Sequence, residues 1–270
     1  MKFKSPCLVN PHEKVRLTKW PAAASVPYKS DEAAAAVLTK HRTQLSELQE
    51  VFFASQKKAL LIVLQGMDTA GKDGVISHIF SGVNPQGCDV TAFKVPTPLE
   101  TRHDFLWRAH AAVPPRGMIG IFNRSHYEDV LSPRVHKKIS GKVMRRRLDD
   151  INSFENMLAD NDVLILKFFL HISRDEQKAR LKARLDNPDK QWKISEADLH
   201  ERRFWPQYED CYNEILSTTS RKHAPWFIIP SNDKHARNLA ISAIIVDLMQ
   251  SLKLTYPKPT INVRDVKAIA

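Results

Sequence analysis

The sixteen residues ALLIVLQGMDTAGKDG, at positions 59–74, decide the fold. They open with an apolar run of strand length, residues 59–65, and pass into Gly66-x-x-x-x-Gly71-Lys72. This spacing is the core of a phosphate-binding loop, in which backbone N–H groups, a lysine and the start of a helix hold phosphate. A strand before the loop and a helix after it, from Lys72 to about Phe80, are the context that the motif requires. The alternative is a glycine turn that joins strand to helix and binds nothing.

Four further segments have the apolar character of strands, and helical sequence separates them. The strands are predicted at 89–95, 116–122, 163–172 and 225–231. The helices are predicted at 30–57, 103–112, 142–158, 174–186, 195–217 and 234–253. Such alternation predicts an α/β fold in which helices cover both faces of a five-stranded, mostly parallel sheet, giving three α/β/α layers.

Ligands of such sheets bind beyond the carboxyl ends of the strands. The chemistry is therefore expected in the segments that follow the first, third and fourth strands. These segments are residues 66–72, 123–129 and 173–184.

The length and charge of the chain limit its organisation and its partners. A chain of 270 residues suits one domain, in which we expect an N-terminal arm over residues 1–30 and a helical lid over about 174–205. Lys and Arg number 41 against 30 Asp and Glu, a net charge of +11. Such a surface attracts polyanions, whether nucleic acid, acidic membrane or phosphate-rich small molecules, although a basic protein without such a partner fits as well.

Other features narrow the choice of partner and compartment. No apolar run approaches the length of a membrane span, so no membrane partner is expected. No nucleic-acid-binding module is recognisable, so nucleic acid is not expected either. The start, MKFKSPCLVN, has no apolar signal core, and the three cysteines form no C-x-x-C pair. A reducing cytoplasm is therefore the expected compartment.

The phosphate loop carries two acids, Asp68 and Asp73, although it is built to hold negative charge. Asp73 stands where Ser or Thr usually helps to hold Mg²⁺. An acid in the first turn of a helix is ordinary capping chemistry, so we do not expect Asp73 to bind metal. Asp68 would repel phosphate unless a cation lay between them, so we expect it to bind Mg²⁺ or to accept a proton from the attacking group. The alternative is a turn-forming side chain that bonds its own loop.

The third predicted strand leads into a second polar loop, NRSHYED (123–129). Arg124 can hold phosphate through its planar fork, and Glu128 brings a carboxylate to the same end of the sheet. Many phosphate-loop proteins have an Asp that helps to hold Mg²⁺ where this chain has Asn123, a weaker ligand. The alternative is a polar helix start with Glu128 in a capping box. His126 is interpreted as structural or solvent-facing.

A basic helical segment follows the fourth predicted strand. Its cations are Lys178, Arg180, Lys182, Arg184, Lys193, Arg202 and Arg203. Such an insertion is typical of a mobile lid whose cations neutralise the charge on a phosphoryl group in transfer. The alternative is a solvated helix face that pairs with its own acids. A second basic cluster, at 137–147, is either an extension of a track for a long polyanion or a charged surface helix.

Several motifs, in order along the chain, resemble the polyphosphate kinase 2 family. They are GMDTAGKDG (66–74), SGVNPQG (81–87), FKVPT (93–97), DFLWR (104–108), IGIFNRSHYEDVL (119–131), HISRDEQKARL (171–181), WKIS (192–195) and PSNDK (230–234). The resemblance extends from about residue 58 to the closing helix, and it is far more specific than the glycine loop alone.

The resemblance implies a P-loop kinase fold like that of thymidylate kinase, with a lid over a five-stranded parallel sheet. It implies Mg²⁺-dependent, reversible phosphoryl transfer between inorganic polyphosphate and a nucleotide, by enzymes that commonly form dimers or tetramers. It implies that Asp68 and Lys72 are essential and that the Walker B segment ends at Asn123-Arg124. The segment is similar to that of class III members, which accept nucleoside monophosphates as well as diphosphates. In this chain, Glu128 is the residue associated with that wider acceptance. The Asn at position 123 puts more weight on Asp68 as a metal ligand.

The expected function is therefore that of a polyphosphate kinase that phosphorylates ADP and AMP to give ATP and ADP. The expected cofactor is Mg²⁺, with Mn²⁺ as its substitute. The expected partners are inorganic polyphosphate, adenine and guanine nucleotides, and further copies of the chain. Two other functions stay open, namely an ordinary ATP-dependent nucleotide kinase and a polyanion-binding protein without activity.

The candidate site residues come from all three polar segments. The candidate catalytic residues are Asp68, Lys72, Arg124, Glu128, Arg180 and Arg184, and the candidate metal ligands are Asp68 and Glu128. The candidate phosphate- and nucleotide-binding residues are Gly66, Met67, Thr69, Ala70, Gly71, Lys72, Asp73, Gly74, Asn123, Arg124 and Lys193.

Overall fold

The computed structural model describes residues 3–24, 28–194 and 196–261, and its centre is a five-stranded sheet. The strands are β1 (Ala59–Gly66), β2 (Cys88–Ala92), β3 (Ile119–Asn123), β4 (Val163–His171) and β5 (Trp226–Pro230). All neighbours are parallel, in the order β2-β3-β1-β4-β5. The predicted α/β class and the number of strands are confirmed.

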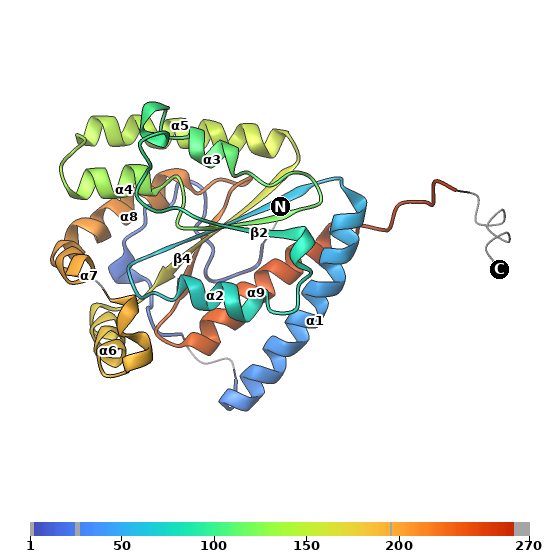
Figure 1. The fold of residues 1–270 in the computed structure, drawn as a ribbon, viewed down its shortest axis with the longest axis horizontal. Helices are drawn as coiled ribbons and strands as arrows, with labels where there is room; N and C mark the ends of the chain where they lie inside the picture. The colour runs from blue at the N-terminus through green and yellow to red at the C-terminus, as the bar shows by residue number, and fades with distance from the viewer. Residues whose placement is uncertain (1–2, 25–27, 195, 262–270) are drawn as a thin grey trace.

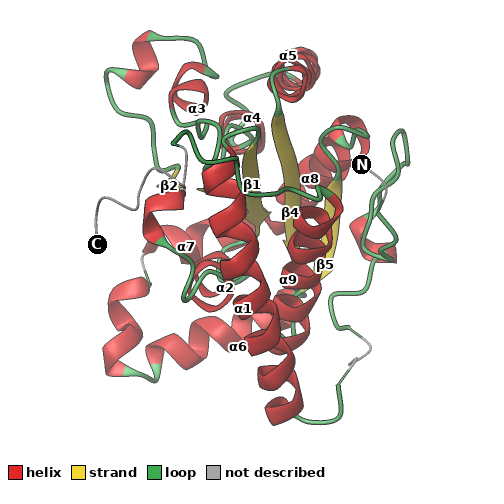
Figure 2. Ribbon diagram, turned by 90° about the vertical axis from the view of Figure 1, so that its right-hand side faces the viewer, coloured by secondary structure: helices red, strands yellow, loops and turns green. Residues whose placement is uncertain are grey.

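Helices cover both faces of the sheet. They are α1 (Asp31–Ser55), α2 (Lys72–Ile79), α3 (Trp107–Ala111), α4 (Glu128–Val135), α5 (Gly141–Asp160), α6 (Arg174–Leu185), α7 (Glu196–Glu201), α8 (Trp205–Thr219) and α9 (Lys234–Ser251). Short 3-10 turns are η1 (Leu17–Lys19), η2 (Pro85–Gly87), η3 (Glu100–Arg102), η4 (Pro188–Lys193) and η5 (Arg202–Phe204). One layer is formed by α1, α2 and α9 and the other by α4, α5 and α8, while α6 and α7 project at one end (Figure 1). Figure 2 shows α1 and α9 side by side in front of the sheet.

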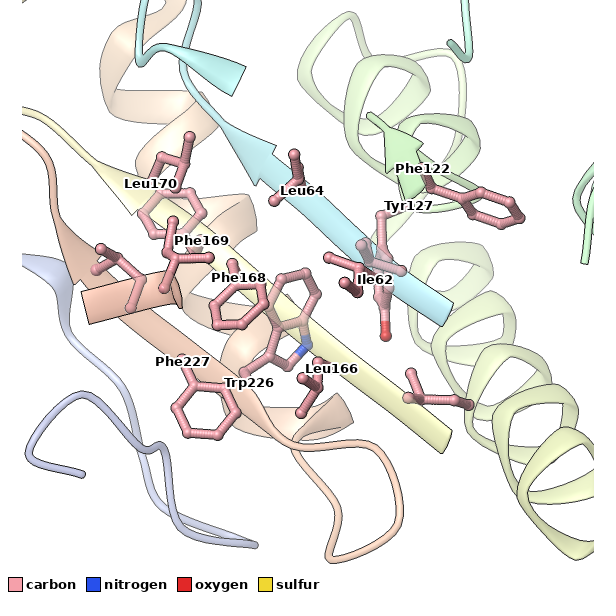
Figure 3. Close-up of a cluster of buried hydrophobic side chains, with 14 of the residues drawn as sticks. Ile62, Leu64, Phe122, Tyr127, Leu166, Phe168, Phe169, Leu170, Trp226 and Phe227 are labelled. Atoms are coloured by element: carbon pink, nitrogen blue, oxygen red, sulfur yellow. The ribbon is translucent and has the colours of Figure 1, made fainter. Parts of the chain in front are cut away.

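The central strands form the core because both of their faces are covered. β1 is buried along its whole length, as a strand between two helical layers should be. On β4 and β5, the side chains of Phe168, Phe169, Trp226 and Phe227 are at most 1% exposed and fill the space around the sheet (Figure 3). This rigid layer fixes the positions at which the strands end.

The N-terminal residues lie along the outer edge of β5. The N–H of Val9 donates to the backbone oxygen of Trp226 at 2.9 Å, and the N–H of Ile228 donates to that of Cys7 at 2.8 Å. These bonds occupy part of an edge that would otherwise present unpaired backbone groups. Residues 1, 2 and 25–27 of the predicted arm lie outside the described residues.

Two predicted helices differ from the structure. The helix predicted at 103–112 begins only at Trp107, because the side chain of Asp104 accepts from the N–H of Leu106 at 3.0 Å and forms a turn first. The helix predicted at 195–217 is wrong as one element, since α7 ends at Glu201 and α8 starts anew with Pro206 in its first turn. Ser195 itself lies outside the described residues.

The remaining differences concern ends of elements and one missing helix. The strand predicted at 89–95 ends at Ala92, and the one predicted at 116–122 begins at Ile119, after a turn in which Gly117 has φ +87°. α4 was not predicted as an element; the sequence suggested only that a polar helix start was possible there. No helix among the described residues has both the length and the apolar character that a bilayer crossing needs.

Candidate active site

The strand order brings three loops together. β1 lies between β3 and β4, so the segments after these strands meet at one edge of the sheet. Parallel strands all point their carboxyl ends the same way, which makes this edge the place for a ligand. The segments predicted to carry the chemistry are the ones that meet here.

The phosphate loop connects β1 to α2 and turns tightly. Gly66 and Gly71 have φ of +154° and +101°. A Cβ on Gly66 would lie 2.7 Å from the backbone oxygen of Leu170, and one on Gly71 would lie 2.0 Å from Nη1 of Arg237. The buried side chain of Lys72 folds back into the loop and donates from Nζ to the backbone oxygen of Gly66 at 2.9 Å. Glycine is therefore required at both positions by packing as well as by φ.

Three consecutive loop carbonyls are held from outside the loop. The oxygen of Asp68 accepts from Nε2 of Gln177 at 3.1 Å, and the oxygen of Thr69 accepts from Nη1 of Arg180 at 3.0 Å. The oxygen of Ala70 accepts from Arg180 at 3.1 Å and from Arg237 at 3.2 Å. In a trans peptide the N–H points away from the C=O, so these contacts turn the N–H groups of Thr69 and Gly71 toward the opposite side, where phosphate would bind, while the N–H of Ala70 donates to the backbone oxygen of Met67 at 3.1 Å.

Two contacts join the phosphate loop to the loop after β3. Nη2 of Arg124 lies 2.8 Å from Oδ1 of Asp68, with 43% and 28% of the two side chains exposed. Nδ2 of Asn123 donates to Oδ1 of Asp73 at 2.7 Å. Arg124 adopts a left-handed backbone with φ 63°, which aims its side chain back at the loop. Asp73 thus contacts Asn123 and stands apart from the Asp68–Arg124 pair.

Glu128 starts α4 and completes a group of two cations and two carboxylates. Burial raises the pKa of Glu128, while Arg124 and Lys72 act in the opposite direction. Burial and the charge of Arg124 lower the pKa of Lys72, against the effect of Asp68 and Glu128. In the amide orientation that satisfies both of its ends, Gln65 donates to Oε1 of Glu128 at 3.0 Å. The four charged groups therefore influence one another directly.

Three cavities surround the loop. The first, which we call the aromatic cavity, has a volume of about 370 Å³. Its lining includes Gly66, Met67, Asp68, Arg124, Glu128, Trp205, Tyr208 and Tyr212. The second, the loop cavity, has a volume of about 410 Å³. Its lining includes Asp68, Thr69, Gly71, Lys72, Asp73, Asn123, Arg124, Arg184 and Lys193.

The third cavity, the basic cavity, has a volume of about 540 Å³ and lies behind the loop. Its cationic lining is Arg42, Arg180, Arg184, Lys190, Lys193, Lys234 and Arg237, with His78 and His235. Gly74 lines it too, whereas Ala70 is fully buried in the loop. Every predicted site residue except Ala70 therefore lines at least one cavity.

The two lid arginines lie in different surroundings. Arg180 donates from Nε to Glu176 at 2.7 Å and from Nη2 to the backbone oxygen of Asn232 at 3.0 Å, besides its bonds to the phosphate loop. All three of its nitrogens are thus engaged. Arg184 is half-buried and has one hydrogen bond among those described, from Nη1 to the backbone oxygen of Lys193 at 3.3 Å, and it lines both the loop cavity and the basic cavity. Arg184 is positioned to meet a ligand, and Arg180 holds the loop.

Several lining residues escaped the sequence reading. They are the aromatic residues Trp205, Tyr208 and Tyr212, and the polar residues Gln177 and Arg237. The three aromatic residues come from α8 and Arg237 from α9, and no shared motif or spacing marks them. Gln177 lies in the HISRDEQKARL motif, which was a signal that could have identified it. Arg202, predicted only as a lid cation, lines the aromatic cavity as well. Lys94 also lines the loop cavity, and its place in the FKVPT motif was a signal that could have identified it.

His126 is structural. Its side chain is fully buried, with Nε2 3.3 Å from Oε1 of Glu155. The solvent-facing alternative is wrong, because the loop after β3 turns this ring down between Tyr127 and Phe154 instead of outward.

The carboxylates of the site fit a divalent cation whose other ligands come from the substrate. Among the described residues no three His, Cys, Asp or Glu side chains converge as metal ligands. Asp68 and Glu128 both line the aromatic cavity. Mg²⁺ commonly uses one or two carboxylates, with phosphate oxygens and water as the other ligands, so this pair suits such an ion.

The chain is similar to known proteins over nearly its whole length. The family model described as Polyphosphate kinase 2 (PPK2) matches residues 28–257. The "ADP-polyphosphate phosphotransferase" of Rhodopseudomonas palustris is 46% identical over 260 residues, which cover 92% of this chain and 90% of that protein. The "AMP/ADP-polyphosphate phosphotransferase" of Meiothermus ruber is 47% identical over 228 residues, covering 84% and 85%. A crystal structure of Polyphosphate Kinase 2 from Arthrobacter aurescens has a TM-score of 0.92 at 41% identity, covering 97% of this chain and 94% of that one.

Proposed function

The chain belongs to the polyphosphate kinase 2 family, and on that premise we propose that it transfers a phosphoryl group from inorganic polyphosphate to both ADP and AMP. Relatives named for ADP alone and for AMP and ADP are almost equally similar to it, at 46% and 47% identity. The choice of acceptor must therefore be argued from the site.

The observation that carries the proposal is the continuity of the loop cavity with the basic cavity. Both are lined by Thr69, Gly71, Arg184 and Lys193. The described residues around the basic cavity include seven Lys and Arg and no Asp or Glu. A single polyanion held at the phosphate loop can continue into this cavity, where the charged side chains of the lining are all basic, which suits a chain of phosphates.

The acceptor nucleotide belongs in the aromatic cavity. Trp205, Tyr208 and Tyr212 offer flat apolar surface for a nucleobase. The opposite part of the lining carries Asp68 and Arg124, which also line the loop cavity. Donor and acceptor phosphates would meet at these two residues.

The roles of the charged groups follow from this arrangement. Lys72 and the N–H groups of Thr69 and Gly71 hold the phosphates of the donor. Arg124 leaves Asp68 and binds the phosphoryl group in transfer, whose charge is spread over its oxygens. Arg184 adds positive charge from the lid side.

Polyphosphate kinases of this family typically need a divalent cation, and we propose Mg²⁺, with Mn²⁺ as its substitute. Asp68 and Glu128 would hold it together with phosphate oxygens. When bound, the cation would neutralise negative charge that develops on the phosphate oxygens. Guanine nucleotides as further acceptors, a homo-oligomeric state and a cytoplasmic location also stay predictions. The three cysteines are free thiols.

The deciding experiment is a transfer assay with long-chain polyphosphate and Mg²⁺, in which AMP and ADP are offered separately. We expect ADP from AMP and ATP from ADP. Use of ADP alone would remove the dual-acceptor part of the proposal. Product formed from ATP but not from polyphosphate would favour an ordinary nucleotide kinase. Salt-sensitive binding of polyphosphate without turnover would favour a binding protein.

Two variants connect the assay to the site. Lys72→Met should lower turnover by at least about 100-fold, because it removes a charge that contacts the transferring phosphates. Glu128→Asn should reduce kcat/KM for AMP by about 10-fold relative to ADP, because the single phosphate of AMP depends more on the cation that Glu128 would help to hold. An unchanged ratio of AMP to ADP use would separate Glu128 from acceptor choice.

A further inference from the structure

Gln177 is a buried amide that has no part in the roles proposed for the charged groups of the site. It lies on α6 with 4% of its surface exposed, at the border of the aromatic cavity. Both ends of its side chain are bonded. Nε2 donates to the backbone oxygen of Asp68 at 3.1 Å, and Oε1 accepts from Nη1 of Arg202 at 2.5 Å. A neutral side chain thus links the phosphate loop to a cation from another element.

Arg202 lies at the far end of the predicted lid. α6 forms the first part of the lid segment. η5, which begins with Arg202, lies near its end, between α7 and α8. Nη1 of Arg202 also donates to the backbone oxygen of Arg174, the first residue of α6, at 3.0 Å. The beginning and the end of the lid segment are therefore held together beside Gln177.

The neighbouring loop carbonyls, those of Thr69 and Ala70, are held by two arginines. Arg180 lies on α6, as Gln177 does, and Arg237 belongs to α9, outside the lid. Within the described part of the chain, Gln177 is the one side chain that joins a loop carbonyl to the residue that ends the lid segment.

We propose that Gln177 is a positioning residue for phosphoryl transfer, since its amide fixes the Asp68 peptide to Arg202 and so lets the lid segment determine where the Asp68 carboxylate lies. The inference rests on the proposed function, in which that carboxylate acts on the phosphates. Rotation of this peptide would move the carboxylate bonded to Arg124 and also the N–H of Thr69. Both groups belong to the phosphate-binding surface.

The expected kinetic effect falls on turnover and not on binding. A displacement of about 1 Å in a catalytic group costs on the order of 100-fold in rate. Gln177→Met keeps the volume and removes both hydrogen bonds, so we expect kcat to fall by about 10- to 100-fold. KM for the nucleotide should stay within about twofold, because the base and ribose do not depend on the Asp68 peptide.

A second variant separates the two halves of the link. Gln177→Glu keeps an acceptor for Arg202 but places a carboxylate oxygen against the carbonyl of Asp68. It should therefore lose turnover as Gln177→Met does. The matched control is Gln191→Met, since Gln191 is an exposed amide on η4 that donates to the backbone oxygen of Leu185 at 2.9 Å. The control should retain the kcat of the unmodified protein.

The test measures kcat, KM and urea unfolding for the three variants, together with amide hydrogen exchange in the peptide that contains residues 66–72. We expect lower kcat and faster exchange in this peptide for the Gln177 variants, with unfolding like that of the control. Unchanged kcat and exchange in Gln177→Met would overturn the inference, as would an equal loss in Gln191→Met. Exchange needs no turnover, so failure of the unmodified protein to use polyphosphate would reject the proposed function and leave this inference tested on its own.

Discussion

The Glu155–Lys167 pair is sealed in the core, whereas the Asp68–Arg124 pair lies open at the mouth of the site. Both side chains of the first pair are 0% exposed, and those of the second are 28% and 43% exposed. The two pairs have the same chemistry and belong to neighbouring parts of the molecule. Their surroundings give them opposite functions.

The sealed pair is part of a buried hydrogen-bond network. Nζ of Lys167 donates to Glu155, to the hydroxyl of Tyr127 at 2.9 Å and to the backbone oxygen of Thr219 at 2.8 Å. An ammonium has three protons, so all of its donors are used. Burial lowers the pKa of Lys167 to about 8, against the opposing effect of Glu155. Because Tyr127 belongs to the loop after β3, the network fixes that loop from below.

The open pair has one bond, at 2.8 Å, and shares its charges with Lys72 and Glu128. Exposed ion pairs contribute only about 0–1 kcal/mol, so Asp68 and Arg124 can separate at little cost. That freedom suits the proposed function, in which Arg124 exchanges Asp68 for phosphate and Asp68 exchanges Arg124 for a cation. The buried pair, Glu155 and Lys167, therefore holds the framework, while the exposed pair, Asp68 and Arg124, lies where side chains can separate.

The largest expected effect comes from breaking the sealed pair. Lys167→Met leaves the carboxylate of Glu155 buried without its cation, and such a loss costs about 3–5 kcal/mol of unfolding free energy. Urea unfolding of the variant measures it. The double variant Glu155→Leu/Lys167→Met removes both charges and should recover most of the loss. A change below about 1 kcal/mol in the single variant would show that the Glu155–Lys167 pair does not hold the framework.

Breaking the open pair should affect activity and spare stability. Asp68→Asn should lower kcat by at least about 100-fold, because in the proposed function the carboxylate of Asp68 places the cation and the phosphates. Its unfolding free energy should stay within about 0.5 kcal/mol of that of the unmodified protein. The matched control is Asp175→Asn, an exposed acid on α6, which should be neutral in both measurements. Near-normal turnover in Asp68→Asn would remove Asp68 from the site.

A smaller effect is expected in the cavities next to the open pair. Lys193→Met should raise KM for long-chain polyphosphate by about 10-fold, since a hydrogen bond to a charged group contributes about 1.5–3 kcal/mol. KM for ADP should not change, and the effect should shrink as salt is added. Lys138→Met, an exposed lysine outside the cavities, is the control. Equal effects of both substitutions would indicate general charge attraction instead of a defined path.

The smallest effect is expected at a surface cluster in which 36–57% of each side chain is exposed. Asp162 lies 2.9 Å from Nζ of Lys58 and 3.0 Å from Arg116, and Lys58 lowers its pKa. A carboxyl whose pKa is lowered by folding adds stability above its unfolded pKa of about 3.9, and that contribution is lost as pH falls through the lowered value. Urea unfolding from pH 7 to pH 2 should show a small deficit in Asp162→Asn that disappears in acid. A deficit that persists at pH 2 would contradict this account.

The phosphate loop and the strands around it could be predicted because their signals are contiguous. Gly66, Gly71 and Lys72 lie within seven residues, and the apolar run before them marks β1. A helix start and a strand are local events, governed by backbone conformation and side-chain pattern. The same reasoning located Arg124 and Glu128, because they directly follow a strand of the same sheet.

The sealed network was not predicted, although one signal was present. Lys167 interrupts the apolar strand VLILKFFLH, and a charge in such a run requires a buried partner. The partners Glu155, Tyr127 and Thr219 come from α5, from the loop after β3 and from the end of α8. Nothing in their spacing associates them with one another, since packing across the sheet brings them together.

What the residues alone determined was the class of fold, the phosphate loop and the charge of the ligand. What only the folded chain decided was the order β3-β1-β4, the three cavities, and which arginine of α6 borders two cavities and which holds the loop. The reason is physical. Helices, strands and turns depend on residues a few positions apart, whereas a cavity or a buried ion pair depends on contacts between segments that meet only when the sheet has formed.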